Sequence, residues 1–249
     1  MGKAWLFLFA FLYSCATTSG STTKMGIQED YRSYVSARTA VLNCQPWPST
    51  ALFPGLPLSK VDEATRASFF GEVDAHVLES FKGQTFMQGF SPTAVKTFLT
   101  ENQKTDLLNA IPQLWTFDRT ACADCKDLGA YYERMVKVRK EWRTWLLDLS
   151  TATHSSDSVL IPFVTFANED QINDRGLLIS KRSMGVALFL VEVQSGDLIW
   201  YSKAQNAQSQ HVLTEWGQSM FPAFPDWKLV TKDLLVETLW REYPGRIFF

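Results

Sequence analysis

The sequence predicts an α+β fold, within the broader α/β class, in which a small mixed sheet packs against amphipathic helices. Apolar residues recur every three or four positions over residues 128–149, which is typical of one face of a helix. The second half instead contains two dense apolar runs of strand length, at residues 159–166 and 185–193. A Gly-containing turn at residues 194–197 follows the second run and predicts a hairpin in the C-terminal half.

The first half is predicted to hold one short strand and several helices. Residues 45–58 contain four prolines, which exclude a helix there, and residues 51–53 can form a short strand. Ser59 and Asp62 predict the start of a helix that ends at Gly83. Two shorter helices are expected, one opening at Ser91-Pro92 and one running from about residue 105 to about residue 112.

The strongest helical pattern predicts a single helix of six turns over residues 128–149. Its opposite side is rich in basic residues, interrupted by Glu133 and Glu141. A solvated face is the favoured interpretation of this side, and a binding patch for phosphate or anionic lipid is the alternative. The basic residues are Arg134, Lys137, Arg139, Lys140 and Arg143.

Three further elements are expected after residue 155. Residues 159–166 form a strand in which Pro162 marks a strand end, a sheet edge or a bulge. A long loop then leads to residues 185–193, whose apolar residues at both odd and even positions predict a central strand covered on both faces. Residues 198–202 return as the second strand of the hairpin, and a final helix covers residues 226–243 before Pro244-Gly245.

The composition of the chain excludes some classes of protein but does not indicate a particular function. The chain has 249 residues and a formal net charge of −2, so it has no sequence-wide basic field to attract nucleic acid. Hydrophobic residues make up 46% of the chain and nine are Trp, which supports a large packed core first and a partner surface second. No segment after the N-terminal run reaches the ~20 apolar residues of a membrane span.

The N-terminal segment predicts export and a lipid anchor. Lys3 precedes an uncharged apolar run at residues 4–14, which as a helix would cover roughly 16 Å, about half a bilayer core. The run is therefore too short to span and suits a secretory signal. It ends in Leu12-Tyr13-Ser14-Cys15, which resembles the bacterial lipobox. That resemblance implies cleavage before Cys15, a diacylglycerol on the Cys15 sulfur with fatty chains such as palmitate, and attachment to a membrane through this lipid.

The expected organisation follows from this anchor. Residues 1–14 form the signal peptide, residues 15–26 carry the lipidated Cys15 and a flexible Thr/Ser/Gly-rich tether, and residues 27–249 form a single domain. By resemblance to enterobacterial sorting, Ala16 in place of Asp favours the outer membrane over the inner one. The folded domain is then expected to face the periplasm.

Three cysteines are left once Cys15 is acylated. Cys122 and Cys125 have the CxxC spacing, and a local disulfide between them is the favoured interpretation in an oxidising compartment. Pairing of Cys44 with one of the two, and redox chemistry at Cys122, stay open. Haem attachment would need His at position 126, where Lys stands, and a zinc site would need further paired ligands.

No residue pattern predicts catalysis, a metal or a cofactor. The chain has no P-loop, nucleophile elbow, zinc-protease motif or dinucleotide-binding motif. The three histidines are isolated in sequence, and structural roles are favoured for all of them. An acidic group after the residue 159–166 strand could bind a cation, although a solvated acidic turn is favoured because calcium-loop spacing is lacking. These residues are His76, His154 and His211, and Glu169, Asp170 and Asp174.

The second half resembles a group of envelope lipoproteins. The segments "SVLIPFVTF", "GVALFLVEVQSGDLIWYSKAQN" and "YPGRI" are similar to lipoproteins with an anticodon-binding-domain-like sandwich, which include the N-terminal domain of TolB, the curli-secretion lipoprotein and small activators of cell-wall synthases. The shared feature is a buried strand, a Gly-Asp-Leu turn at residues 196–198 and a second strand carrying Trp200. The resemblance implies a protein that works by binding partners, and it carries no catalytic residue across.

These observations predict a membrane-anchored, non-enzymatic binding or assembly factor of the cell envelope, with a protein partner. Two alternatives stay open. One is a periplasmic thiol–disulfide oxidoreductase that uses Cys122 and Cys125, and the other is a lipoprotein hydrolase with a dispersed site. Exposure of Cys122 distinguishes the first alternative, because a redox enzyme needs an accessible thiolate there. The oligomeric state is not predicted.

Overall fold

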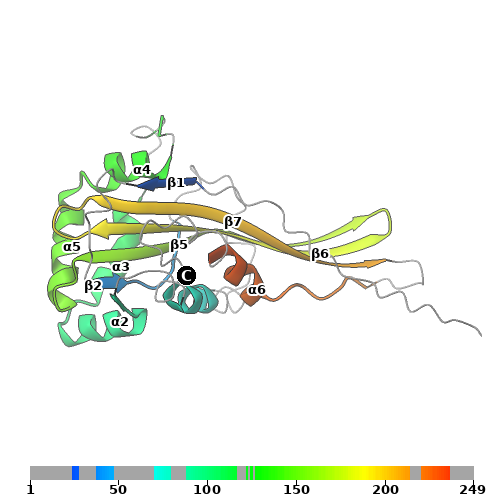
Figure 1. Cartoon of the computed structure of the whole chain (residues 1–249), viewed down its shortest axis with the longest axis horizontal. Helices are drawn as coiled ribbons and strands as arrows, with labels where there is room; N and C mark the ends of the chain where they lie inside the picture. Colours follow the sequence, from blue (N-terminus) through cyan, green and yellow to red (C-terminus); the bar gives the residue numbers. More distant parts are fainter. Residues whose placement is uncertain are drawn as a thin grey trace, which may run out of the picture.

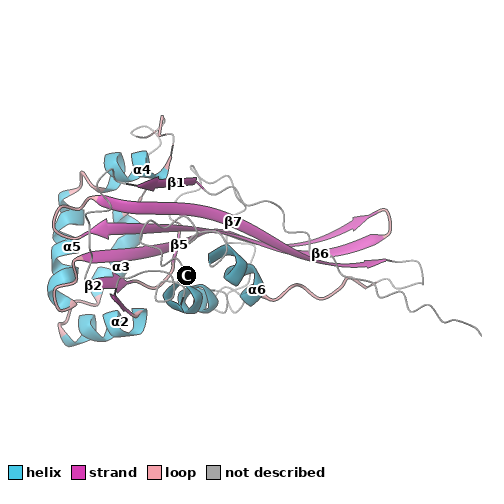
Figure 2. Cartoon of the chain, viewed as in Figure 1, coloured by secondary structure: helices cyan, strands magenta, loops and turns pink. Residues whose placement is uncertain are grey.

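A computed structural model describes residues 24–27, 38–47, 70–79, 88–116, 122, 124–125, 127–213 and 220–235. It confirms the predicted α+β class, with one mixed sheet and helices on both of its faces (Figures 1 and 2). The seven strands are β1 (Lys24–Ile27), β2 (Arg38–Val41), β3 (Gln45–Pro46), β4 (Gln88–Phe90), β5 (Ser158–Asp174), β6 (Leu177–Glu192) and β7 (Leu198–Leu213).

The sheet has the strand order β1-β7-β6-β5-β2-β4, and β3 pairs with β5 beside β2. In the part of the sheet formed by β1, β7, β6 and β5, neighbouring strands are antiparallel. Strands β2 and β3 run parallel to β5, and β4 runs parallel to β2. The central position of β6 confirms the strand expected at residues 185–193. The hairpin expected with residues 198–202 is also confirmed, and both of its strands are longer than expected.

The helices are α2 (Pro92–Glu101), α3 (Asp106–Leu114), α4 (Leu128–Tyr131), α5 (Lys140–Ala152) and α6 (Trp227–Lys232), together with a π-helical turn η3 (Tyr132–Val136). Residues 70–79 are also helical and belong to the helix expected from Ser59. Ser91 caps α2 as expected, since its hydroxyl accepts the Ala94 N–H at 3.1 Å. Asp226 caps α6 in the same way through the Lys228 N–H at 2.9 Å.

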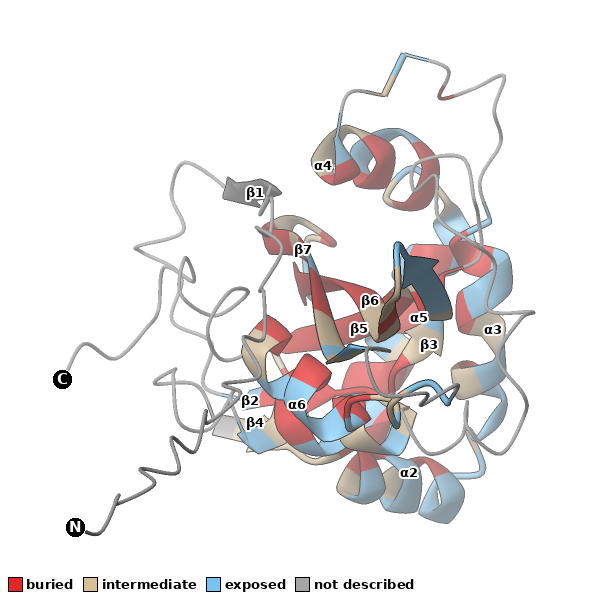
Figure 3. Cartoon of the chain, turned by 90° about the vertical axis from the view of Figure 1, so that its right-hand side faces the viewer, coloured by how far each residue is buried: buried red, intermediate tan, exposed pale blue. Residues whose placement is uncertain are grey.

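Two hydrophobic cores lie on opposite faces of β6, whose buried residues are drawn red in Figure 3. Phe189 and Val191 face the core formed with α2 to α5, and Leu188 and Leu190 face the core formed with α6 and residues 70–79. Successive side chains of a strand point to opposite faces, so a strand between two cores is apolar at every position. This arrangement is the physical reason for the uninterrupted apolar run in β6.

The single helix predicted over residues 128–149 is wrong, because the chain breaks at Arg139. Arg139 has extended backbone angles (φ −78°, ψ 127°), which end one helical segment and begin α5. Its guanidinium donates to the carbonyls of Met135, Gln113 and Thr116 at 2.7–3.1 Å, and these contacts hold the break in place. The π turn before it changes the helical phase, so that Val138, expected on the buried face, is 69% exposed.

The long loop predicted between residues 166 and 185 is also wrong. Strands β5 and β6 continue through this region as a hairpin that turns at Arg175-Gly176. Both turn residues have positive φ, 51° and 88°, as a two-residue hairpin turn of this kind requires. The polar composition of residues 168–175 hid the strands, because an apolar pattern is the main sequence signal of a strand.

Three other expectations differ from the structure or fall outside it. Pro162 lies inside β5, between the segments that pair with β2 and β3, so it is at a gap in the partner strands and not at a strand end. Residues 24–26, expected in the tether, belong to β1. The strand expected at residues 51–53 and the end of the C-terminal helix lie outside the described residues.

Candidate functional site

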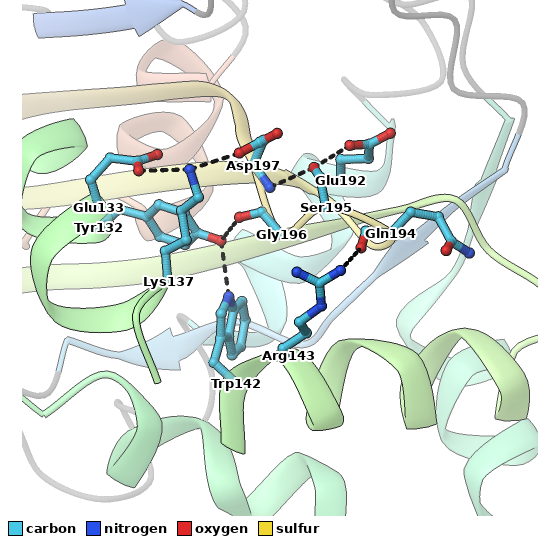
Figure 4. Close-up of polar contacts among 10 residues, drawn as sticks. All are labelled: Tyr132, Glu133, Lys137, Trp142, Arg143, Glu192, Gln194, Ser195, Gly196 and Asp197. Carbon is cyan, nitrogen blue, oxygen red and sulfur yellow. Dashed lines mark hydrogen bonds and ion pairs between the residues drawn. The ribbon is translucent and has the colours of Figure 1, made fainter. Parts of the chain in front are cut away.

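A polar network at the end of the sheet surrounds the turn between β6 and β7 (Figure 4). The Tyr132 hydroxyl donates to the Gly196 carbonyl at 2.7 Å and accepts the Trp142 indole N–H at 2.9 Å. Both rings are fully buried, and burial raises the pKa of Tyr132 well above its ordinary value. The turn therefore rests on a neutral tyrosine that joins η3 to α5.

A charged cluster completes this network on the outer side of the turn. The Lys137 ammonium lies 2.8 Å from the Glu133 carboxylate and 2.7 Å from the Asp197 carboxylate. The Ser195 hydroxyl donates to the Glu192 carboxylate and accepts the Asp197 N–H, and Arg143 donates to the Gln194 carbonyl at 3.1 Å. The hydrogen bonds and ion pairs drawn as dashed lines in Figure 4 together hold the turn at residues 194–197 in place.

Replacing Asp197 with Asn should destabilise the protein at neutral pH and have little effect in acid. The hydrogen bond from Lys137 holds the pKa of Asp197 below its ordinary value. An acid with a depressed folded pKa stabilises the fold above its unfolded pKa, and this contribution is lost as the pH falls through the folded pKa. The difference in Tm between wild type and Asp197→Asn should therefore shrink below about pH 4.

Thermal melts from neutral to acid pH measure this difference. The exposed Glu101→Gln substitution on α2 serves as the control and should leave Tm unchanged throughout. A Tm difference for Asp197→Asn that does not depend on pH would contradict the role given to the Asp197 carboxylate.

The basic residues expected on a solvated helix face are mostly engaged in internal contacts. Besides the contacts of Lys137, Arg139 and Arg143, Arg134 forms an ion pair with Asp124. Arg139 binds the carbonyls at the C-terminal end of α3, where the helix dipole favours a cation. Most of these basic side chains are therefore not available to bind a phosphate or an anionic lipid, which disfavours the alternative interpretation.

A cleft lies between α3 and α5. Its volume is about 410 Å³, its apolar part includes Leu107, Ala110 and Leu114, and its charged rim includes Lys140 and Glu141. Trp145 is only 3% exposed and donates its indole N–H to the Leu107 carbonyl at 2.7 Å, which fixes the floor of the cleft. Asp148 at the edge pairs with Lys104 at 3.4 Å. An apolar floor with a charged rim is typical of a surface that receives an apolar side chain.

Cys122 and Cys125 form a disulfide in the structure, with their Cα atoms 5.1 Å apart. Cys122 is 2% exposed. A buried first cysteine does not offer the accessible thiolate that a thiol–disulfide oxidoreductase requires, so the geometry favours a structural disulfide just before α4.

Cys44 is free and buried, as expected if Cys122 and Cys125 pair with each other. Burial, and then the nearby Asp74 carboxylate, raises the pKa of the Cys44 thiol well above its ordinary value. Asp74 accepts hydrogen bonds from the Asn43 side chain and the Cys44 N–H, and burial raises its pKa. Cys44 is therefore held as an unreactive thiol.

The acidic group expected in a loop lies on strand β5, where its members are used separately. Glu169 binds the Arg182 guanidinium at 2.7 Å, and Asp170 accepts a hydrogen bond from Asn168. Asp174 is exposed beside the Arg175-Gly176 turn. The three residues thus share no common centre for a cation. Among the described residues, no group of three or more His, Cys, Asp or Glu side chains is placed to hold a metal ion.

Arg182 is the most heavily engaged cation of the described chain, and sequence reasoning missed it. Besides Glu169 it binds the Pro225 carbonyl at 2.7 Å, and its guanidinium lies 4.9 Å from the Trp227 ring centroid and 5.4 Å from that of Phe224. It therefore fastens the segment before α6 to the sheet. Its sequence neighbourhood carries no signal, because all four contacts come from residues at least 13 positions away.

The three histidines lie on different elements: His76 in helical residues 70–79, His154 after α5, and His211 on β7. The His154 ring packs edge-on against the Phe98 ring, with 4.5 Å between the ring centroids. His211 shares a hydrogen bond with Ser209. Cys15 and the rest of the predicted lipobox lie outside the described residues. No helix in the described ranges is long and apolar enough to cross a membrane.

Comparison with known proteins gives distant structural similarity only. No protein-family model matches the chain, and no curated protein matches its sequence. The PelC dodecamer from Paraburkholderia phytofirmans matches at a TM-score of 0.34 and 8% identity, over 88% of this chain and 94% of that one.

Two further solved structures are similar at the same level. Lipoprotein GNA1162 from Neisseria meningitidis matches at a TM-score of 0.36 and 12% identity, over 74% of this chain and 87% of that one. The hypothetical protein CT253 from Chlamydia trachomatis matches at a TM-score of 0.31 and 12% identity, over 82% and 93%. The structural neighbours thus include a lipoprotein, but similarities of this size assign no function.

Proposed function

We propose that the chain is a lipid-anchored lipoprotein of the bacterial cell envelope that faces the periplasm and binds a partner protein without catalysing a reaction. The anchor is Cys15, at the end of the apolar run that resembles a signal with a lipobox. The proposal of a binding role rests on the α3–α5 cleft. In this cleft, apolar residues and charged groups lie side by side at the surface.

The chemistry of the cleft supports protein binding over catalysis. Its hydroxyl, on Thr144, donates to the Lys140 carbonyl at 3.2 Å, and one of its carboxylates, on Asp148, already pairs with Lys104. A hydrolytic site would need a nucleophile within hydrogen-bond reach of a base. We infer a partner segment that inserts one apolar side chain above Trp145 and sets polar groups against Lys140 and Glu141.

A pair of matched variants tests the cleft as the binding site. Thr144 and Thr151 are both exposed on α5, and both donate a hydrogen bond to the carbonyl four residues before them. Only Thr144 lines the cleft. Thr144→Arg should obstruct the cleft, Thr151→Arg should not, and neither should lower Tm appreciably because Arg is a better helix former than Thr.

The measurement is photocrosslinking in intact cells, with a photoreactive phenylalanine analogue in place of Glu141 at the cleft rim. A discrete adduct should form in the Thr151→Arg background and fall about tenfold in the Thr144→Arg background, since a bulky side chain in a small binding pocket removes more than about 1.4 kcal/mol of affinity. An equal adduct in both backgrounds, or none in either, would overturn the cleft as the partner site.

A further inference from the structure

The far ends of β5, β6 and β7 project beyond the helices. Figure 1 shows α2 to α5 gathered at one end of the sheet, while the hairpin between β5 and β6 and the end of β7 extend away from them at the other. The register pairs Ile172 with Ile179 and Leu177 with Leu213 across this projection. We refer to these four residues, together with Met220 and Phe221, as the tip patch.

The tip patch is unusually apolar for an exposed surface. Ile172 is 46% exposed, Leu213 is 52% exposed and Met220 is 80% exposed. Of the seven large hydrophobic residues that are exposed in the described chain, four belong to this patch. The Ser180 hydroxyl donates to the Pro222 carbonyl at 2.6 Å, and because Ser180 lies on the face of β6 opposite to Ile179, Met220 and Phe221 belong to the other face of the projecting end. A cluster of exposed apolar side chains of this kind marks an interaction surface.

The charges around the tip patch cancel. Asp170 and Asp174 on β5 are balanced by Lys181 on β6 and Arg175 in the turn between the two strands. A surface with balanced charge and apolar side chains gains little from an oppositely charged partner. Most of the binding free energy of such a surface comes from removing its apolar area from water, and this contribution depends little on salt concentration.

The direction of β1 relates the tip patch to the N-terminal anchor. Lys24 pairs with Lys203 and Ile27 pairs with Trp200, so the chain enters β1 from the side of the projecting end. The nine residues from Cys15 to Lys24 can span at most about 30 Å. The ten residues of β7 from Lys203 to Leu213 cover about 34 Å, so a fully extended tether ends about 4 Å short of the level of the tip, and the lipid chains on Cys15 must span this gap.

We propose that the tip patch rests on the surface of the membrane in which Cys15 is anchored, with its apolar side chains in the interfacial region of the lipid. The proposal rests on the anchoring part of the proposed function. A second apolar contact besides the lipid anchor fixes the orientation of the domain on the membrane. The helical end, with the α3–α5 cleft, would then point away from the lipid toward a periplasmic partner.

The test uses the full lipidated protein in vesicles of phosphatidylethanolamine and phosphatidylglycerol that contain a phospholipid with a photoreactive acyl chain. Flotation comes first: the wild type should float and Cys15→Ser should not. After illumination, mass spectrometry maps the labelled peptides. Label should concentrate in residues 168–181 and 207–213, should be low in residues 134–152, and should change little between low and high salt.

Matched variants complete the test. The double substitution Ile172→Asp and Leu213→Asp should lower the label at the tip about tenfold, because two apolar side chains lose their burial in lipid. Val138→Asp, which replaces a still more exposed apolar residue at the helical end, should leave the label unchanged. The distribution of label on the wild-type protein tests the orientation by itself, even if a variant does not fold.

The outcomes separate the two proposals. A wild type that does not float overturns the lipid anchor. A wild type that floats with equal label at the tip and at residues 134–152 overturns the orientation. A tip without label, together with a dimer that the double substitution dissociates in sedimentation, would assign the tip patch to a second copy of the chain and overturn the lipid contact.

Discussion

Replacing Phe189 with Asp is expected to leave no soluble folded protein. Phe189 lies at the centre of β6, is fully buried, and contacts the Trp115 ring at a centroid distance of 4.6 Å and the Phe163 ring at 5.9 Å. Among the described residues, no Lys or Arg is buried and could pair with a carboxylate at this position. A buried, unpaired carboxylic acid costs roughly 2–7 kcal/mol even when it takes up a proton, and loss of the buried ring costs roughly 3–5 kcal/mol more. Together these losses are as large as the 5–15 kcal/mol that stabilises a typical domain.

The measurements are the soluble fraction after expression and the thermal melt of any soluble protein. Leu229→Asp is the control, since Leu229 is 55% exposed on α6 and its replacement should change Tm little. A soluble Phe189→Asp protein that melts cooperatively near the wild-type Tm would contradict the placement of β6 between two cores.

Replacing Arg182 with Met should cost about 3 kcal/mol of folding free energy. Met keeps much of the side-chain length, but it removes the ion pair to Glu169, the hydrogen bond to the Pro225 carbonyl and the contacts of the charge with two aromatic rings. The Arg182 and Glu169 side chains are 19% and 26% exposed, so Glu169 would be left as a partly buried, unpaired carboxylate. The segment that leads into α6 should loosen before the rest of the sheet.

Chemical denaturation measures the loss, and hydrogen exchange locates it in residues 222–235. Arg134→Met removes an ion pair with Asp124, but those side chains are 50% and 73% exposed, so the loss of stability there should be much smaller. Equal effects of the two substitutions, or unchanged exchange in residues 222–235, would show that Arg182 does not fasten this segment.

The parts of the fold that follow from local apolar patterns were predictable, and the parts that depend on distant contacts were not. The central strand β6, its hairpin with β7 and the capped start of α2 follow from residue periodicity and capping chemistry. The break at Arg139 does not, because it depends on carbonyls of Gln113 and Thr116 that lie more than 20 residues earlier.

The same distinction holds for the sites. The CxxC spacing alone predicted the Cys122–Cys125 disulfide, since a pair three residues apart needs no knowledge of the fold. The α3–α5 cleft joins two helices whose separation in sequence hides their contact, and the tip patch is polar enough along β5 to pass for a loop. The Arg-Gly turn at residues 175–176 was its one local signal, because Gly favours positive φ at such a turn.

The strand order has a consequence for how the chain is made. In the described sheet, β2, β3 and β4 join only through β5, and β1 joins only through β7, more than 170 residues later. Contacts between such distant residues form slowly, because a long loop must close before they contribute. Of the described strands before residue 150, only β2 and β4 can pair with each other before the C-terminal half has left the ribosome. We therefore expect the two hairpins of β5, β6 and β7, which are made last, to form before the earlier strands join the sheet.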